Sequence, residues 1–401
     1  MAATRYFGMD IHKRHVTVAA LDAQQQVVYE PKKVSIDHFP AWAHLNLDAH
    51  DEVAMEATIN AWEFHDQLLP LVADVSVANC HQLRLISASA AKTDKHDALV
   101  LAKLLAANLL PTVWVPPQHV RDLRNLTRHR SWLIHRRTAL KNRLHALLHR
   151  HNLAPPEGNP FTASNEAWWD DLPCSPVERL QLRHDWETHH HLDRQIAETE
   201  AEIAQLSIAE PWQEEMTFLM QISGVGLYTG MTILAAIGDI ERFPSAQQLV
   251  GYAGLGARVH DSGDTHRGGK ISKRGRRELR TALVACAWVA VRWSAHWRHV
   301  FERLAKRIGK QRAITAVARK LLVVIWHVLT KRQADRYADP EAVARSFMRW
   351  SERHHLARSQ NMPRIEFVRA RLDRLDMCRH VASFRANGRT HYLPEAASVA
   401  V

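Results

Sequence analysis

The feature that most constrains this chain is a pair of long polar segments of opposite charge. The first, residues 118–150, carries nine Lys or Arg and a single acid, Asp122. The second, at about 176–207, gathers four acids within ten residues. Both have helical periodicity, and the connection between them contains Pro, Trp and Asn. We therefore expect a long hairpin of two helices.

The chain is long and apolar enough for several folded domains. Its 401 residues suffice for two or three domains of about 100 to 200 residues each, and 46% of them are hydrophobic. Fifty-three Lys and Arg against 42 Asp and Glu give a formal net charge of +11. The length and the apolar content exclude a disordered tail or a mini-protein. The positive net charge makes a polyanion the leading partner.

Cysteine usage and the N-terminus both favour a protein of the cytoplasm. The four cysteines form no Cys-x-x-Cys pair, which indicates neither a disulfide framework nor a cysteine zinc site. The first residues lack the apolar run of a signal peptide. The most apolar stretch, 279–291, is shorter than the roughly 20 residues of a membrane span, so we expect a buried helix there and no membrane partner.

Residues 1–111 alternate between strand and helix signals. Two short β-rich runs separated by a polar turn predict an antiparallel hairpin, and a third run extends the sheet. Helices and strands then alternate, which is typical of a mixed α/β layer fold. The predicted strands are 5–10, 15–22, 26–34, 52–57 and 74–78, and the predicted helices are 37–49, 60–69 and 94–107.

The rest of the chain is predicted to be mostly helical. Residues 112–210 hold the hairpin, and 211–350 are helical except for a Gly- and Lys-rich segment at 251–275, which has too much glycine for regular structure. The last stretch, 351–401, is polar and punctuated by Gln, Asn, Arg and Pro. We expect it to be a partly ordered tail, to which the pattern assigns no role.

Four acids at the ends of predicted elements form the first candidate site. Asp10 and Glu56 each end a strand, whereas Asp94 and Asp97 stand at i and i+3 at the start of a helix, hence on one helix face. Converging carboxylates repel one another unless a cation holds them, and such oxygen ligands suit Mg²⁺. Two ions about 3.5 to 4 Å apart would clamp the attacking and leaving oxygens of a phosphodiester.

Acids at strand ends and helix starts are also common as caps and as solvated charges, and this alternative stays open for each residue. Glu56 is the hardest to explain in that way, because its neighbours in 53–57 are apolar. Of the two acids at the helix start, either Asp94 or Asp97 could act on a metal ligand without contacting the metal directly.

A second candidate is the Gly-Val-Gly turn of the segment 221–240. Gly224 and Gly226 precede a Thr-rich apolar helix, as in a helix-hairpin-helix turn, where glycines let backbone N–H groups approach a phosphate at a helix N-terminus. Tight packing between helices would also select small residues. DNA-backbone contact and packing are therefore equal alternatives for this turn.

The third candidate is the Gly-rich segment at 249–283. Ser262 stands beside Gly263, and cations follow at short intervals. A serine on a loop surrounded by Arg and Lys could attack a phosphodiester, because the cations would stabilise the charge on phosphorus. The candidate nucleic-acid ligands of this run are Arg267, Lys270, Lys273, Arg274, Arg276 and Arg277.

The serine assignment has competitors. A Ser-Gly step is far more often a turn than a nucleophile, and no general base is identified, although His260 and His266 are near in sequence. Ser272 is a rival nucleophile in the same cationic segment. As a phosphate-binding surface, the basic run is the safer prediction.

Taken in order, these motifs resemble the DEDD transposases of the insertion-sequence 110 family, and within it the 1111 subgroup. The resemblance spans about residues 5 to 350. It rests on YFGMDIHKRHVTVAALD, the strand EVAMEA, KTDKHDALVLAKLL, ISGVGLYTGMTILAAIGDIERF and SGDTHRGGKISKRGRRELR. The ordered set is far more specific than any one of these motifs.

The resemblance implies three functional domains. Residues 1–111 would be a RuvC-like domain of the RNase H type, 112–210 a coiled-coil dimerisation hairpin, and 211–350 a helical transposase domain with Ser262 as the nucleophile. The four acids of the RuvC-like domain would be Asp10, Glu56, Asp94 and Asp97. Ser262 is preferred over Ser272 because the family places its serine in the Ser-Gly step.

The resemblance also implies the partners and the reaction. The protein would be a bacterial, cytoplasmic enzyme, associated with the nucleoid when it acts, that exchanges strands between donor and target DNA within a homo-oligomer, from dimer to tetramer. A structured noncoding RNA would pair with both DNAs and supply the specificity, as in other RNA-guided systems. Cleavage would use Mg²⁺ and pass through a serine–DNA phosphodiester.

Two other functions stay open at this point. One is a metal-dependent hydrolytic nuclease of the junction-resolvase type, in which water attacks and Ser262 is a turn residue. The other is a non-catalytic nucleic-acid-binding protein, which the net charge alone would favour.

Overall fold

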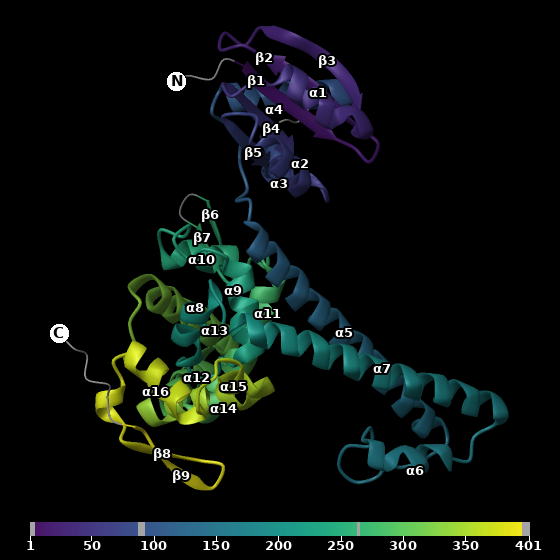
Figure 1. Ribbon diagram of the computed structural model, residues 1–401, viewed down its shortest axis with the longest axis vertical. Coiled ribbons are helices and arrows are strands. Elements are labelled where there is room, and N and C mark those ends of the chain that lie inside the picture. The colour runs from purple at the N-terminus through teal and green to yellow at the C-terminus, as the bar shows by residue number, and fades with distance from the viewer. Residues whose placement is uncertain (1–4, 87–92, 263–264, 395–401) are drawn as a thin grey trace. The chain divides into compact units, whose positions relative to one another are not determined.

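The computed structural model describes residues 5–86, 93–262 and 265–394. The chain forms two compact units, Met1–Pro117 and Gln118–Val401. Figure 1 shows the first as a sheet with helices and the second as helices with two small hairpins of strands. The expected order of an α/β region followed by a mostly helical region is thereby confirmed.

Unit 1 is built on a five-stranded mixed sheet with the order β3-β2-β1-β4-β5. The antiparallel pairs are β1 with β2 and β2 with β3, whereas β4 runs parallel to both β1 and β5. The strands are β1 (Arg5–Ile11), β2 (His15–Leu21), β3 (Val27–Ser35), β4 (Asp51–Glu56) and β5 (Asp74–Ala78). All five predicted strands are confirmed, because alternating or continuous apolar runs bounded by polar turns left little choice.

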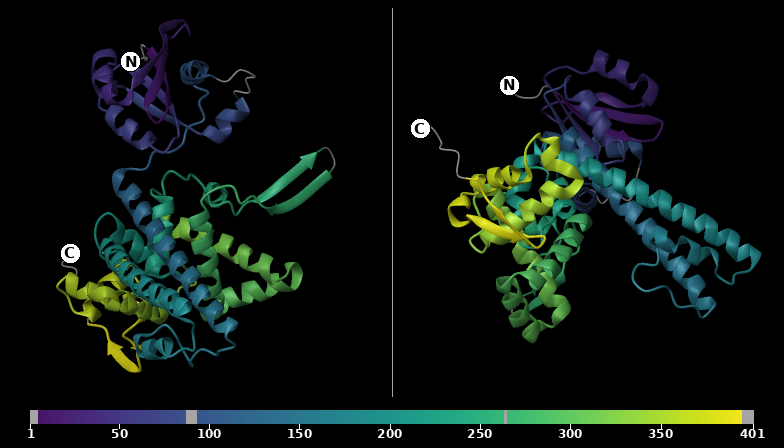
Figure 2. Two further views of the ribbon diagram at one scale, coloured as in Figure 1. Left: turned by 90° about the vertical axis from the view of Figure 1, so that its right-hand side faces the viewer. Right: turned by 60° about the horizontal axis from the view of Figure 1, so that its bottom comes forward.

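Helices cover both faces of this sheet (Figure 2). After the short η1 (Ile36–His38), α1 (Phe39–Asn46) and α2 (Ala61–Leu68) share an apolar core with one face. On the other face, α4 (Asp94–Ala106) and α3 (Cys80–Ile86) pack against Tyr6, Ala54 and Ala78. Because side chains alternate along a strand, residues 8 and 10 of β1 and residues 54 and 56 of β4 point to the α4 face.

Gly8 brings α4 unusually close to the sheet. A Cβ added at Gly8 would lie 1.9 Å from the carbonyl oxygen of Ala98 and 2.7 Å from the amide nitrogen of Ala102, both in the backbone of α4. The small residues Ala98 and Ala102 are fully buried at this crossing. Only glycine permits this approach, which places the start of α4 beside the end of β1.

Unit 2 begins with the predicted helical hairpin, formed by α5 (Gln118–Arg150) and α7 (Pro176–Leu206). The two helices lie side by side and extend away from the rest of the unit (Figures 1 and 2). Opposite charges pair across them: Arg137 contacts Asp193 at 2.6 Å, Arg143 contacts Asp185 at 2.8 Å, and Arg130 contacts Glu200. The opposite charges of the two segments are therefore partly neutralised within the chain.

Residues 151–175, at the far end of the hairpin, form a small distal knob with its own apolar core. It contains η2 (Ala163–Asn165) and α6 (Glu166–Asp170). Trp169 is almost fully buried, its indole nitrogen donates to the carbonyl oxygen of Pro160 at 2.7 Å, and its ring packs near Phe161 and Trp186. The knob therefore holds the ends of α5 and α7 at a fixed separation.

The body of unit 2 is a group of helices around α13 (Lys310–Lys331). Its other members are α8 (Trp212–Met220), α9 (Leu227–Ile237), α10 (Ala246–Tyr252), α11 (Arg277–Trp293) and α12 (Ala295–Ile308). Among the described residues, α13 is the helix long and apolar enough to cross a membrane. Half of its apolar stretch is buried against neighbouring helices. A core helix meets the same criteria. The buried helix expected at 279–291 is observed within α11.

Two predictions about unit 2 were wrong. The Gly-rich segment at 251–275 is not irregular: it contains β6 (Ala257–Ser262) and β7 (Thr265–Ile271), an antiparallel pair that projects from the body as a β-arm (Figure 2, left). Glycine weakens an isolated strand, but cross-strand pairing compensates for this here.

The segment after residue 350 is more ordered than expected. Beyond α14 (Pro340–Glu352) come η3 (Arg353–His355), α15 (Leu356–Ser359), α16 (Arg364–Arg374), η4 (Cys378–His380), β8 (Ser383–Ala386) and β9 (Arg389–Tyr392). Phe367 and Leu372 of α16 are fully buried, and Trp350 donates to Ser207 at 2.9 Å. Few but regularly spaced apolar residues anchor this polar segment.

The contact of Gly8 with α4 gives a first prediction. Gly8→Ala should lower the free energy of unfolding by roughly 1 to 3 kcal/mol, because its methyl group meets helix backbone that has no room to move. Urea unfolding followed by circular dichroism measures this. Gly251→Ala is the control: space around Gly251 is open, so alanine in that helix should be neutral or stabilising by up to about 1 kcal/mol. Equal stability of the two variants would contradict the argument.

Candidate active site

Asp10 and Glu56 lie next to each other at the ends of two parallel strands. Met9 pairs with Met55 in the β1–β4 register, so the residues that follow are neighbours. Both carboxylates belong to the face that α4 covers, and both residues are half-buried. This placement follows from the register alone, which is why the sequence could predict it.

The start of α4 brings Asp94 and Asp97 to the same place. Thr93 caps the helix by accepting from the amide of His96 at 3.3 Å, which fixes where the first turn begins. Burial raises the pKa of Asp10 above its ordinary value, His12 opposes this, and the negative charges of Asp94 and Asp97 raise the pKa further. Three of the four predicted acids are therefore close enough to interact electrostatically.

Three basic side chains outside the predicted acidic cluster surround Asp94. Lys33 of β3 donates to its carboxylate at 2.7 Å, and ring nitrogens of His12 and His15 lie 3.4 Å and 3.6 Å from it. Chiefly through the Lys33 hydrogen bond, the pKa of Asp94 is lowered to about 2. His12 also contacts Asp10 at 3.0 Å. In the sequence, the only sign of these contacts is the polar turn between β1 and β2, which has a His at each end.

The donor set fits a divalent cation. Asp10 is half-buried among like charges that disfavour its ionised form, and a bound cation would reverse that penalty. Carboxylate oxygens suit Mg²⁺, and the ligand atoms of His12, His15 and Asp94 lie within 4.8 Å of one another. Asp94 already has Lys33 as a cationic partner in this structure.

Ser262 ends strand β6, where its backbone pairs with Thr265. Its side chain lies outside the described residues, as do the side chains of Arg267 and Lys270. Ser272 follows β7 at the opposite end of the β-arm, with its amide bonded to Gly256 at 2.8 Å. Ser272 lies seven residues beyond Thr265, the partner of Ser262, or about 23 Å along an extended strand, so the rival serines cannot serve one phosphate from the same position.

The base of the β-arm is fixed to the body by close backbone contacts. Gly254 and Gly275 have positive φ angles of 68° and 129°, and a Cβ on Gly275 would lie 2.2 Å from the carbonyl oxygen of Tyr252. Arg276 donates to the Tyr252 hydroxyl at 2.8 Å. Of the predicted nucleic-acid ligands, Arg276 is thus half-buried, whereas Lys273, Arg274 and Arg277 are exposed.

Packing explains Gly224 of the Gly-Val-Gly turn. Its φ is 93°, and a Cβ there would lie 2.2 Å from the carbonyl oxygen of Cys286 in α11. The amide of Gly226 donates to the Thr229 hydroxyl at 2.9 Å, as part of the start of α9. The structure therefore favours the packing alternative for Gly224, and the phosphate contact stays a prediction.

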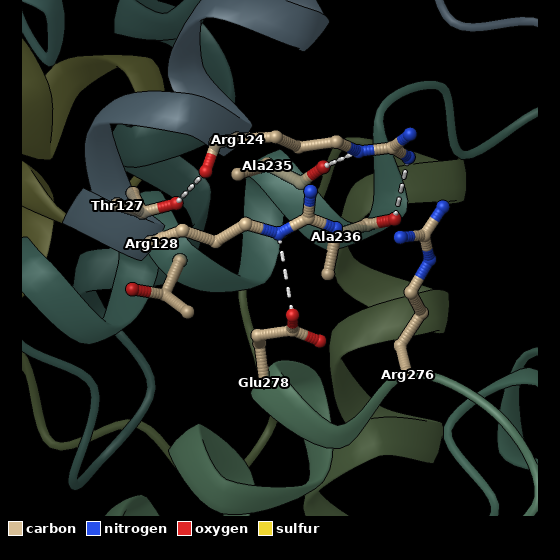
Figure 3. A pocket seen from close by; sticks show the side chains of 8 residues that line it. Arg124, Thr127, Arg128, Ala235, Ala236, Arg276 and Glu278 are labelled. Atoms are coloured by element: carbon tan, nitrogen blue, oxygen red, sulfur yellow. Dashed lines mark hydrogen bonds and ion pairs between the residues drawn. The ribbon is translucent and has the colours of Figure 1, made fainter. Parts of the chain in front are cut away.

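Arginines surround the carboxyl end of α9 (Figure 3). Arg124 donates to the carbonyl oxygens of Ala235 and Ala236 at 2.6 Å and 3.1 Å, and burial lowers its pKa to about 10. Cations suit the negative end of a helix dipole. Arg276 and Glu278 also line this small pocket, and Arg128 of α5 donates to Glu278 of α11 at 3.3 Å, so these contacts link α5 to both α9 and α11.

Comparison with known proteins matches both units. A family model described as "Transposase IS116/IS110/IS902 family" matches residues 216–302, and a DEDD model described as "Transposase" matches residues 7–153. The transposase for insertion sequence element IS1111A of Coxiella burnetii is 25% identical over 350 residues, covering 84% of this chain and 92% of the relative.

Two further relatives extend the comparison. The pilin gene-inverting protein of Moraxella bovis is 29% identical over 60% of this chain and 67% of its own length. The transposase for insertion sequence element IS1328 of Yersinia enterocolitica is 27% identical over 63% of this chain and 78% of its own length. Together with the family models, they define the chain as a DNA-cleaving and rejoining enzyme of the transposase class.

The chain belongs to the insertion-sequence 110 family of transposases. The matched ranges contain the β1, β4 and α4 residues of the acidic cluster and the whole β-arm. The resemblance inferred from the sequence motifs is thereby confirmed.

The ion pair of Asp94 gives a second prediction. Lys33→Met should raise the pKa of Asp94 from about 2 toward 3.8, because the largest cause of its depression is lost. A lowered folded-state pKa stabilises the fold above the unfolded value and loses that effect as the pH falls toward 2, so the variant should show a weaker loss of stability in this window. A ¹³C NMR titration of the carboxylates measures the pKa. Lys32→Met, at the neighbouring exposed position, should leave Asp94 unchanged.

Proposed function

We propose that this transposase exchanges strands between donor and target DNA through a covalent serine–DNA intermediate, with Asp10, Glu56, Asp94 and Asp97 as its metal-binding acids and Ser262 as its nucleophile. The observation that carries the proposal is the convergence of strand-end and helix-start carboxylates on the α4 face of one sheet. Burial, together with the negative charges of Asp94 and Asp97, raises the pKa of Asp10, so its ionised form is unfavourable unless a cation is bound. The strand order β3-β2-β1-β4-β5 supports assigning unit 1 to the RuvC-like, RNase H type.

The acids prepare the phosphodiester for attack. Two divalent cations, Mg²⁺ in this proposal, would supply Lewis-acid stabilisation of the charge that develops on the phosphoryl oxygens. Asp10 and Glu56 hold fixed positions on neighbouring strands, and Asp94 and Asp97 approach from the helix. His12 and Lys33 orient Asp10 and Asp94 by direct contacts and balance part of their charge.

The serine step exchanges one phosphodiester bond for another, so the free energy of that bond is retained. The Ser262 oxygen forms a bond to phosphorus, the bond from phosphorus to one deoxyribose oxygen breaks, and the proton passes overall from the serine hydroxyl to that leaving oxygen. Attack by another DNA end reverses the same step and rejoins the strands, so no nucleotide cofactor is consumed. Water attack would instead end in a cut, which is the outcome of a hydrolytic nuclease.

The β-arm and its flanks are the proposed contact surface for the nucleic-acid backbone. Lys273, Arg274 and Arg277 are exposed beside its base, and Arg267 and Lys270 belong to β7. Backbone cations bind without reading sequence. We propose that a structured noncoding guide RNA reads donor and target by base pairing, because backbone cations alone supply no sequence specificity.

A homo-oligomer completes the proposal. Joining two duplexes requires at least two cleavage centres, so a dimer or tetramer is the minimal assembly. The α5–α7 hairpin is the proposed coiled-coil dimerisation element, since its long polar helices extend from the body of unit 2 (Figure 1).

Removal of one acid tests the metal-binding role. Asp10→Asn should lower strand exchange by about 100-fold or more, the scale of losing an electrostatic contact to a transition state, while DNA binding persists. Recombination of a plasmid bearing donor and target sites is the readout, with gel-shift binding beside it. Asp37→Asn, an exposed acid of the same unit, is the control and should retain activity. Full activity of the native protein in excess EDTA would refute the metal requirement.

Trapping the intermediate tests the serine. Ser262→Ala should abolish both recombination and the covalent protein–DNA complex that survives denaturing electrophoresis when a nicked substrate stalls the reaction. Gel-shift binding of DNA should be unchanged. Ser272→Ala, at the other end of the β-arm, should retain the complex. Cleavage without any covalent complex in the native protein would favour the hydrolytic nuclease instead.

A further inference from the structure

The distal knob brings together three side chains that are typical metal ligands. His151 follows the last turn of α5, Cys174 ends the knob, and Glu178 lies in the first turn of α7. The imidazole nitrogen, the thiol sulfur and a carboxylate oxygen all lie within 4.8 Å of one another. Nothing in the transposition chemistry above uses these residues.

The backbone around the cluster fixes its geometry. Ser175 and Glu178 form a reciprocal capping box at the start of α7, in which one carboxylate oxygen of Glu178 accepts from the Ser175 amide at 3.1 Å. The other carboxylate oxygen faces the His151 ring nitrogen at 3.1 Å. The amide of His151 remains bonded to carbonyls of α5, and Cys174 packs against the apolar core of the knob. The three ligands are therefore held in place before any ion arrives.

The spacing is close to that of a tetrahedral zinc site. Zinc bonds of about 2.0 to 2.3 Å place neighbouring ligand atoms roughly 3.3 to 3.8 Å apart. The His151–Glu178 distance already falls just short of this range, and the sulfur needs to move by about 1 Å at most. Three protein ligands leave the fourth position to water.

The chemistry of the donors selects zinc over magnesium. A thiolate and an imidazole are borderline-soft ligands, which suit Zn²⁺ and not Mg²⁺. The carboxylate and the thiolate together would neutralise the ion. Cys174 would bind the ion as a thiolate and release its proton on binding. Arg150, 3.8 Å from the Glu178 carboxylate, is the nearby cation that competes with the ion.

We propose that His151, Cys174 and Glu178 form a zinc site, with water in the fourth position, that clips the end of α5 to the start of α7 and closes the knob between them. Bound zinc would add to the apolar core of the knob in stabilising the far end of the hairpin. It is independent of the acidic cluster in unit 1 and of the proposed reaction.

Zinc titration of the metal-free full-length protein tests the proposal. Isothermal titration should give one site per chain that requires Cys174, and Co²⁺ in place of zinc should give the charge-transfer absorption of a thiolate ligand. Cys174→Ser should weaken binding by more than the roughly 10- to 100-fold that loss of a supporting partner costs at a metal site. Arg150→Gln should strengthen binding, because it removes the competing cation.

Matched variants separate this site from other ligands in a chain with 27 His. Cys378→Ser changes another half-buried thiol and should leave binding intact. Glu178→Gln keeps the capping box but loses the anionic ligand, so weaker zinc binding with an unchanged helix content supports the site. Zinc affinity that is the same in Cys174→Ser, or that is lost only in His12→Ala, would overturn the proposal.

Discussion

The active centre depends on the close packing of one helix against one glycine. Where α4 crosses β1, its backbone occupies the space that a side chain at Gly8 would fill. This contact fixes the height of α4 above the sheet, and the cap at Thr93 fixes where the helix begins. Together they determine where Asp94 and Asp97 lie relative to the strand-end acids. The position of the charges is therefore set by an apolar contact between small residues, since the charges themselves repel.

The excess of Lys and Arg residues has two different roles in this molecule. On α5 much of it faces the acids of α7, where partly exposed ion pairs contribute only about 0.2 to 1 kcal/mol each. They are too weak to hold the hairpin, which relies on the seam of buried Leu133, Leu192 and Ile196 and on the knob. The pairs instead favour one alignment of the two helices. Lys273, Arg274 and Arg277 beside the β-arm are exposed, and they account better for attraction to a polyanion.

The sequence predicted the regular elements well because their signals are local. Strand runs in unit 1, the two long helices and the capped start of α4 follow from periodicity and caps. The β-arm was missed because its glycines do not favour a strand in isolation. The folding of α16 was missed because only three buried apolar residues, Phe367, Val368 and Leu372, anchor an otherwise polar segment. For the site, strand register brought Asp10 and Glu56 together as expected. The contacts of Lys33 and His15 with Asp94 join β3, β2 and α4, and such long-range contacts leave no pattern in a short window of sequence.

The β-arm acts mechanically as a lever. The base of the arm is fixed by the backbone contacts of Gly254 and Gly275 and by the hydrogen bond from Arg276 to Tyr252. The proposed nucleophile lies at the opposite end, the tip of the arm. Over an arm of about 17 Å, a rotation of roughly 10° at the base moves the tip by about 3 Å, and a displacement near 1 Å already costs much of the rate of a positioned reaction. The stiffness of the backbone contacts at the base of the arm would therefore decide how accurately the serine meets its phosphate.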